Sequence, residues 1–332
     1  INFHRDSIDG VAQSVEESGM RIILGRGCWD LPGLAPEGLT EDVDTAVKES
    51  ERVVSRWHGK ADGRIIVRVE ASMLAQCTDE MLQATRELAA KHGIGWASHI
   101  QYKLGSSRTD PRRDDPSLRR YNGRSIEYLE HLGVLGPDSL LIHCTNVGNR
   151  EIRILARTGT PVAHCPIANA WSGNPIVTPV HAMLEKGVTV GLGTDSVATN
   201  DSLDLFQAMK FCALVHKVNM GSSSAMTAEK AIEMSTIDSA KALRLDHQVG
   251  SLEVGKKADI ILLDMESPGM TPSIAPVKNL VYGAGGGRAV SGVIIDGKVV
   301  MEDGVIRTLD ERGVYRRAEE KGREILRNIG RL

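Results

Sequence analysis

The segment Val188-Thr-Val-Gly-Leu-Gly-Thr-Asp195 carries a short apolar run directly into an aspartate. A run that lacks regular polar alternation is typical of a parallel strand that is buried on both faces. A carboxylate at the end of such a strand lies at the carboxyl-terminal edge of the sheet, where the catalytic residues of α/β barrels gather. The segment therefore predicts a parallel α/β fold with a functional Asp195 at its rim.

Similar apolar runs precede this segment, and amphipathic stretches separate them. The expected strands are 21–25, 64–69, 95–99, 140–144, 161–164 and 188–193. The expected helices are 79–92 with Thr78 as N-cap, 179–187 with Thr178 as N-cap, and a helix capped by Ser202 that runs to about Lys217. Repeated strand–helix units imply a parallel sheet, either a closed barrel or a doubly wound open sheet.

Six such strands fall short of the eight in a TIM (β/α)₈ barrel, which takes roughly 250 residues. The 332-residue chain begins at Ile1 rather than Met. We therefore expect a TIM barrel whose strands 1 and 2 are not part of this sequence. An open six-stranded sheet is the alternative that the pattern alone leaves open.

After about residue 245 the pattern changes to short strands with tight turns. The expected strands are 258–263, 292–295 and 298–301, with hairpin turns at Asp296-Gly297 and Asp303-Gly304 and a charged helix from Tyr315 to Leu332. We therefore expect two domains. Residues 1–245 form the barrel, and residues 246–332 form a small antiparallel β domain with a terminal helix.

Composition restricts the classes of partner. A net charge of −3 gives no basic field for nucleic acid, and no apolar run approaches the roughly 20 residues of a membrane span. The five cysteines show no CxxC spacing, which indicates reduced thiols and excludes the deaminases that bind zinc through CxxC. We expect a cytoplasmic protein that acts on a small molecule, with a homodimer as the default assembly.

Three histidines also close apolar strands. His99, His143 and His164 end the runs that begin near Gly95, Leu140 and Pro161. One such histidine is usually a hydrogen-bonded core residue, but recurrence at equivalent rim positions favours a metal site, because imidazole and carboxylate together suit Zn²⁺ or another first-row divalent ion. The histidines expected at the surface are His58, His92, His131, His216 and His247.

The stretches around these residues carry a wider pattern. They read Leu141-Ile-His143-Cys, Pro161-Val-Ala-His-Cys-Pro-Ile-Ala-Asn169, Gly193-Thr-Asp195-Ser-Val-Ala-Thr-Asn200-Asp-Ser-Leu-Asp204, and Gly250-Ser-Leu-Glu-Val-Gly-Lys-Lys-Ala-Asp259. The pattern resembles the amidohydrolase superfamily, in its cytosine-deaminase-like and triazine-hydrolase-like branch. The resemblance spans nearly the whole chain and implies one bound divalent metal, zinc first and iron as the alternative.

The resemblance also implies roles for particular residues. Two metal ligands come from an HxH motif on strand 1, which this sequence lacks. The strand 5 histidine, a ligand, matches His99, and the strand 8 aspartate, also a ligand, matches Asp195. The strand 6 histidine, which contacts water or substrate, matches His143. The residues expected to bind substrate are His4, Gln101, Tyr102, His143, His164 and Asn169.

Deaminases of this branch carry a glutamate three residues after the strand 5 histidine. Here Tyr102 stands at that position, and a phenol with a pKa of about 10 is a poor base at neutral pH. Glu70, at the end of an expected strand, is the alternative acid. Alternatively, the substrate does not require protonation of a ring nitrogen, so that no glutamate is needed at position 102.

The expected reaction is metal-assisted hydrolysis of a carbon–nitrogen bond. The metal lowers the pKa of its water, Asp195 binds the ion and accepts the proton, and His143 stabilises the developing oxyanion. The first expectation is deamination of a small N-heterocycle. The alternatives are an amide, urea or carbamate hydrolase and a metal-free, non-catalytic relative.

Overall fold

The computed structural model describes residues 7–32, 38–100, 124–174 and 176–331. Its larger sheet contains six parallel strands. They are β1 (Ile22–Cys28), β2 (Ile65–Met73), β3 (Trp96–Ile100), β4 (Ser139–His143), β5 (Val162–His164) and β6 (Val190–Leu192). Each strand corresponds to one of the expected apolar runs, so the expected parallel α/β class is confirmed.

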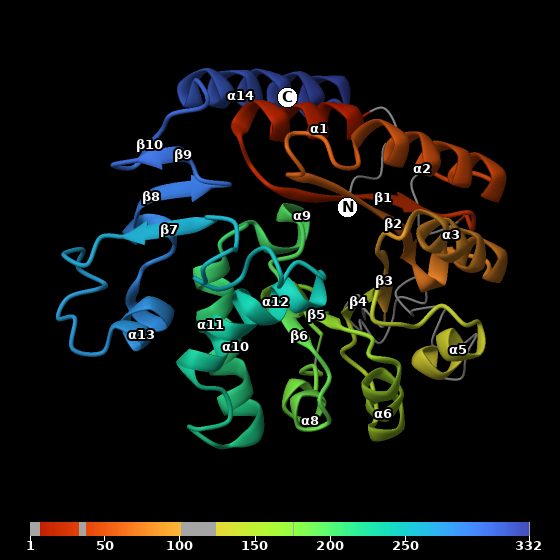
Figure 1. Ribbon diagram of the computed structural model, residues 1–332, viewed down its shortest axis with the longest axis horizontal. Coiled ribbons are helices and arrows are strands. Elements are labelled where there is room, and N and C mark those ends of the chain that lie inside the picture. The colour runs from red at the N-terminus through yellow and green to blue at the C-terminus, as the bar shows by residue number, and fades with distance from the viewer. Residues whose placement is uncertain (1–6, 33–37, 101–123, 175, 332) are drawn as a thin grey trace.

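The order of these strands distinguishes a barrel from a doubly wound sheet. Each strand pairs with the one before it in the chain, from β1 to β6, as Figure 1 shows. A doubly wound sheet reverses direction at a switch point, whereas a barrel adds strands in one direction. The observed order therefore has the winding of a TIM barrel.

Helices alternate with these strands and cover their outer side (Figure 1). They are α1 (Ile8–Ser18), α2 (Val43–Trp57), α3 (Asp79–His92), α5 (Ser125–His131), α6 (Asn149–Thr158), α7 (Pro166–Trp171), α8 (Val180–Glu185), α9 (Val197–Asn200), α10 (Leu205–Met220), α11 (Ala228–Ser235) and α12 (Ile237–Ala242). Helices α2 and α3 pack against β2, and α8, α10, α11 and α12 pack against β6. None of the helices in the described ranges is both long and apolar enough to cross a membrane.

The helix starts test the predicted caps. Thr78 caps α3 as expected, because its side chain accepts a hydrogen bond from the backbone N–H of Met81. The other two predictions are wrong. Asp204 rather than Ser202 caps α10, and Thr178 donates to the carbonyl oxygen of His143 at 3.3 Å instead of capping α8. The Asp204 cap is a local contact with the backbone N–H groups of Phe206 and Gln207, whereas the Thr178 contact joins segments 35 residues apart.

Strand register brings the strand ends to a common level. In the β3–β4 pair, His99 lies opposite Ile142 and Ile100 lies opposite His143. A bulge in β2 between Glu70 and Met73 shifts its pairing with β3. The carboxyl ends of β3 and β4 therefore lie side by side at one rim of the sheet.

The second sheet is antiparallel and contains the carboxyl-terminal strands. Its order is β10-β9-β8-β7, with β7 (Ile260–Leu263), β8 (Val290–Ile295), β9 (Lys298–Glu302) and β10 (Val305–Ile306), and it is flanked by α13 (Pro276–Lys278) and α14 (Glu311–Asn328). Arg21 joins this unit to the first strand through an ion pair with Asp259 at 2.6 Å. The small β unit is confirmed, while the boundary at residue 245 stays a prediction.

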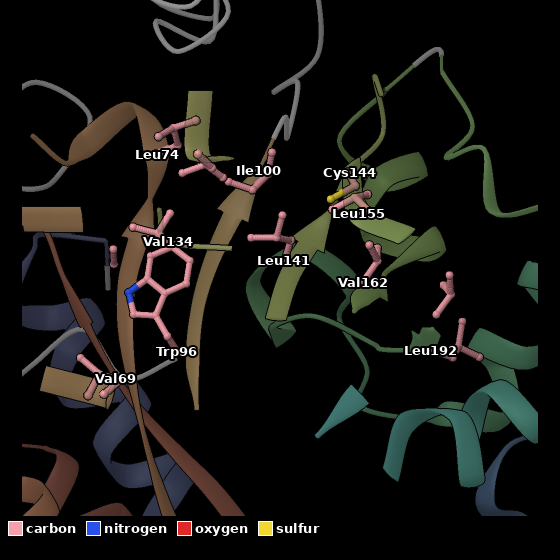
Figure 2. Packing of buried hydrophobic residues seen from close by; sticks show 14 of the residues in the cluster. Val69, Leu74, Trp96, Ile100, Val134, Leu141, Cys144, Leu155, Val162 and Leu192 are labelled. Carbon is pink, nitrogen blue, oxygen red and sulfur yellow. The ribbon is translucent and has the colours of Figure 1, made fainter. Parts of the chain in front are cut away.

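The core lies between the larger sheet and its helices. Leu141 of β4 is fully buried and lies opposite Val162 of β5. Figure 2 shows Leu141 among buried side chains of neighbouring elements, including Ile100 and Leu155. This layer holds the two strands whose ends carry His99 and His143.

Replacing Leu141 by Ala is expected to lower the free energy of unfolding by about 2–5 kcal/mol, because the change leaves a cavity at a site with no solvent exposure. Urea-induced unfolding measures the effect. The matched control is Val218→Ala, at a side chain that is 83% exposed, where the change should stay within about 0.5 kcal/mol. Equal effects at the two positions would contradict the assigned core.

Candidate metal centre and active site

Three of the predicted site residues come together at the rim. His99 of β3, His143 of β4 and Asp195, which follows β6, each place a ligand atom within 4.8 Å of the others. Nε2 of His143 lies 3.6 Å from a carboxylate oxygen of Asp195, and the ring centroids of His99 and His143 are 5.5 Å apart. The structure therefore groups side chains that are 96 positions apart in the sequence, from residue 99 to residue 195.

The backbone at two of these residues is strained. His143 has φ of 73° and Asp195 has φ of 63°, which is the left-handed region that non-glycine residues rarely adopt. Such conformations cost about 1–3 kcal/mol and persist where the surrounding structure imposes them, often at functional sites. This left-handed backbone at His143 and Asp195 is a second indication of a site.

The protonation of His99 follows from its hydrogen bond. Nδ1 of His99 lies 2.6 Å from the carbonyl oxygen of Ser72. A carbonyl only accepts hydrogen bonds, so Nδ1 carries the proton and Nε2 of the neutral ring holds a lone pair. Ser72 lies within the bulge of β2, which brings its carbonyl group to the imidazole.

His143 is held in the same tautomer by a side chain. Asn169 of α7 accepts a hydrogen bond from Nδ1 of His143 at 2.9 Å. The amide nitrogen of Asn169 in turn faces Thr178 at 3.5 Å, and this sets the orientation of the amide. Nε2 of His143 therefore carries the lone pair, and it points towards the Asp195 carboxylate.

These contacts bring three hydrogen-bond acceptors together, and a bound cation would offset their mutual repulsion. Two imidazole lone pairs and one carboxylate face one another, and each partner hydrogen bond leaves no ring proton on the facing side. Groups that only accept repel one another when buried, unless a cation lies between them. Two nitrogens and a carboxylate oxygen form a donor set that zinc and similar divalent ions bind. The residues present therefore fit the implied metal.

Burial keeps the two imidazoles neutral. Desolvation lowers the pKa of His143 to about 3, with a further lowering from His99. Desolvation also lowers the pKa of His99, although the charges of Glu70 and Asp195 and the Ser72 carbonyl act in the opposite direction. Neutral imidazole is the form that binds metal ions, so both rings are in the correct state near neutral pH.

The remaining predicted site residues are distributed differently. Asn169 lies behind His143 as its hydrogen-bond partner. His164 is 1% exposed and faces His216 of α10, with 3.2 Å between their Nε2 atoms. His4, Gln101 and Tyr102 lie outside the described residues. The substrate contacts expected of these residues stay predictions.

One prediction about the histidines is wrong. His216 was expected at the surface but is 2% exposed. It lies towards the carboxyl-terminal end of α10 and meets His164 of β5. Its spacing of four residues from the buried Cys212 is the helical signal that would have indicated a common inward face.

Asn169→Ala should weaken the site by removing the acceptor that holds the His143 tautomer. Loss of such a supporting partner costs about 10–100-fold in metal affinity or activity. Zinc affinity measured by competition with a chromogenic chelator tests this. Asn174→Ala is the control, since that side chain bonds Thr145 rather than His143. Unchanged zinc affinity in the Asn169 variant would remove its supporting role.

The buried His216 predicts acid sensitivity. Desolvation, aided by the charge of His181, lowers its pKa from 6.5 to about 4. Because the folded-state pKa is the lower one, the stabilisation is complete above pH 6.5 and is lost as the pH falls towards 4. Between these two pH values the unfolded chain binds one more proton at this residue, so the free energy of unfolding falls by about 1.4 kcal/mol for each pH unit of acidification.

Urea unfolding of chelator-treated protein at pH 7 and pH 5 measures this loss. His216→Gln should reduce the difference between the two pH values, because the variant has one fewer buried imidazole to protonate. The control His247→Gln changes an exposed histidine and should leave the difference as it is. The same pH dependence in all three proteins would refute the assignment.

Comparisons relate this chain to known proteins. The model of the Amidohydrolase family matches residues 1–300. The 5'-deoxyadenosine deaminase of Methanosarcina acetivorans is 37% identical over 322 residues, which are 96% of this chain and 70% of the relative. The 5-methylthioadenosine/S-adenosylhomocysteine deaminase of Desulforamulus reducens is 34% identical over 316 residues, 95% of this chain and 69% of the relative.

Solved structures show the same fold. A zinc-bound adenosine deaminase from Xanthomonas campestris superposes with a TM-score of 0.86 at 23% identity, over 97% of this chain and 70% of that chain. A zinc complex of atrazine chlorohydrolase from Arthrobacter aurescens TC1 superposes with a TM-score of 0.84 at 22% identity, over 94% of this chain and 68% of that chain. The expected TIM-like barrel with a small β domain and the resemblance to triazine hydrolases are confirmed.

The relatives also confirm the expected chemistry, a metal-dependent hydrolysis of carbon–nitrogen bonds that deaminates a small heterocycle. The alternative of an unrelated open sheet is wrong, since the family model covers most of the chain. This chain belongs to the amidohydrolase family.

Proposed function

We propose that this chain deaminates an adenosine-like nucleoside whose 5' position carries no free hydroxyl group, with 5'-deoxyadenosine as the first candidate. The observation that carries the proposal is the convergence of His99, His143 and Asp195 with all their facing atoms acting as acceptors. The substrate class is supported by the relatives, which are named 5'-deoxyadenosine deaminase and 5-methylthioadenosine/S-adenosylhomocysteine deaminase.

His99 and Asp195 would hold a divalent ion beside His143, with zinc as the first choice and iron as the second. When bound, such an ion supplies a water molecule of lowered pKa as the nucleophile. Asp195 is suited to take the proton from this water, because its carboxylate lies at the site and is only partly exposed. His143, held by Asn169, orients the water or the substrate. Gln101, Tyr102 and His4 are proposed only as substrate contacts.

Deamination also needs a group that delivers a proton to the ring and to the leaving nitrogen. We propose Glu70 of β2 for this role, since Tyr102 occupies the position of the family glutamate. The Glu70 side chain is 8% exposed, and its Oε2 has no hydrogen-bond partner among the described residues. Its charge acts on His99, so it lies within electrostatic range of the site.

The site of Glu70 is shaped to receive that side chain. A Cβ atom on Gly25 of the neighbouring strand would lie 2.1 Å from Oε1 of Glu70, and real atoms do not approach so closely. Glycine at this position in β1 therefore makes room for the carboxyl group. A larger residue at position 25 would displace Glu70 towards or away from His99.

A decisive experiment measures ammonia release from the zinc-reconstituted 332-residue chain. The substrates are 5'-deoxyadenosine, 5'-methylthioadenosine and adenosine, and a coupled assay follows the ammonia. We expect turnover of the first two. Asp195→Asn should lower kcat/KM by at least ~100-fold, because it removes both a ligand and a proton acceptor. Chelator treatment should abolish turnover, and zinc should restore it.

Asp201→Asn is the matched control, since Asp201 is an exposed aspartate near the end of α9 and should retain wild-type turnover. Hydrolysis of an amide, urea or carbamate panel without ammonia release from nucleosides would favour the first alternative. A folded chain that neither retains zinc nor turns over any of these compounds would favour the non-catalytic alternative.

A cytoplasmic location and a homodimer complete the proposal. The five cysteines are all buried and form no disulfide bonds, as expected for a reducing compartment. Sedimentation of the purified chain would measure its oligomeric state.

A further inference from the structure

A second group of ligand-type side chains lies outside the site described above. His164 ends β5, while Cys212 and His216 lie one turn apart on α10. One ligand atom from each residue lies within 4.8 Å of the other two. The spacing of four residues on a helix directs Cys212 and His216 to the same face, and this face meets the end of the strand.

These side chains are withdrawn from solvent. Cys212 is 0% exposed, His164 is 1% exposed and His216 is 2% exposed. Nδ1 of His164 has no hydrogen-bond partner among the described residues. Buried polar groups are normally hydrogen-bonded or bound to a metal ion, so a cluster of three such side chains needs an explanation beyond packing.

The spacing of the ring nitrogens agrees with a shared ion. The Nε2 atoms of His164 and His216 are 3.2 Å apart. Two nitrogens bound tetrahedrally to zinc at about 2.0–2.1 Å lie about 3.3 Å apart. A nitrogen and a thiolate sulfur on the same ion lie about 3.6 Å apart by the same reasoning. The observed upper limit of 4.8 Å for the three atoms requires only a small side-chain adjustment.

The protonation states of the three side chains are compatible with a bound cation. Burial lowers the pKa of His164 and of His216, so both rings are neutral near pH 7. Burial also raises the pKa of the Cys212 thiol to about 12, which keeps it protonated when no ion is bound. A divalent ion bound by the three residues would displace the thiol proton to solvent and leave a thiolate paired with the cation.

Space for a further ligand is present beside His164. A cavity of about 50 Å³ is lined by His164, Asn169, Thr178 and Phe211, among others. This is enough for a water molecule. Of the three residues only His164 lines this cavity, so a water molecule in it would lie on the His164 side of the group.

We propose that His164, Cys212 and His216 form a second metal site that binds a borderline-soft divalent ion such as Zn²⁺. The site shares no ligand with the group formed by His99, His143 and Asp195. Its ion joins the end of β5 to α10, so it acts on the stability of the barrel wall next to the active site. Imidazole and thiolate together select zinc over magnesium and calcium, which prefer oxygen ligands.

Cobalt is the probe that tests the proposal, because a Co²⁺–thiolate bond absorbs in the near ultraviolet and a site without thiolate does not. The chelator-treated wild-type chain is titrated with Co²⁺, and bound metal is counted by elemental analysis. We expect the thiolate band in the wild type and its loss in Cys212→Ser, which should also bind one ion fewer per chain. Zinc should raise the unfolding temperature of the wild type more than that of Cys212→Ser.

Cys165→Ser is the matched control. Cys165 is a buried cysteine next to His164 and near Asp195, so its replacement should leave the band in place. Asp195→Asn should also keep the band, and this separates the second site from the proposed deaminase centre. If the chain shows the thiolate band but releases no ammonia from the nucleosides, the proposed function is refuted and the second metal site is retained.

The absence of a thiolate band in the wild type at saturating Co²⁺ would overturn the proposal and leave a plain hydrogen bond between His164 and His216. Retention of the band and of the metal count in Cys212→Ser would overturn it as well. If Cys212→Ser does not fold, His216→Gln takes its place. In that variant, circular dichroism first verifies the native fold, and the band should again be lost.

Discussion

The candidate active site depends on the mutual repulsion of three unprotonated acceptors, which His99, His143 and Asp195 bring together at one rim of the sheet. Ser72 and Asn169 each hold the Nδ1 proton of one imidazole. The opposite nitrogens are thereby forced to face the Asp195 carboxylate without a proton between them. A cation between these groups would relieve the repulsion, and the hydrogen bonds behind the imidazoles orient the rings towards it.

The sheet architecture makes this arrangement possible. Parallel strands added in one direction place their carboxyl ends at a common rim, and the β3–β4 register brings His99 and His143 to nearly the same level. His143 and Asp195 adopt left-handed backbone conformations there. The strain is local, and the buried layer beneath it, which includes Leu141, supplies the stability that maintains it.

Buried imidazoles connect stability, pH and metal binding in this fold. Four histidines, His99, His143, His164 and His216, have lowered pKa values because burial disfavours their charged forms. The same desolvation that makes them metal ligands near neutral pH makes the metal-free protein sensitive to acid. Two of these histidines belong to the candidate active site, and the other two meet between β5 and α10.

The sequence alone determined the parallel α/β class, the six strands and the strand-terminal positions of His99, His143 and Asp195, because apolar runs and their polar ends are local features. It also identified the family through extended motifs and showed Tyr102 in place of the family glutamate. Tertiary structure decided which ring nitrogen of His99 and of His143 carries the proton, since Ser72 and Asn169 come from other elements. It likewise decided the buried position of His216 and the role of Thr178. Those features depend on which segments meet in space, and short-range periodicity holds no information about such long-range contacts.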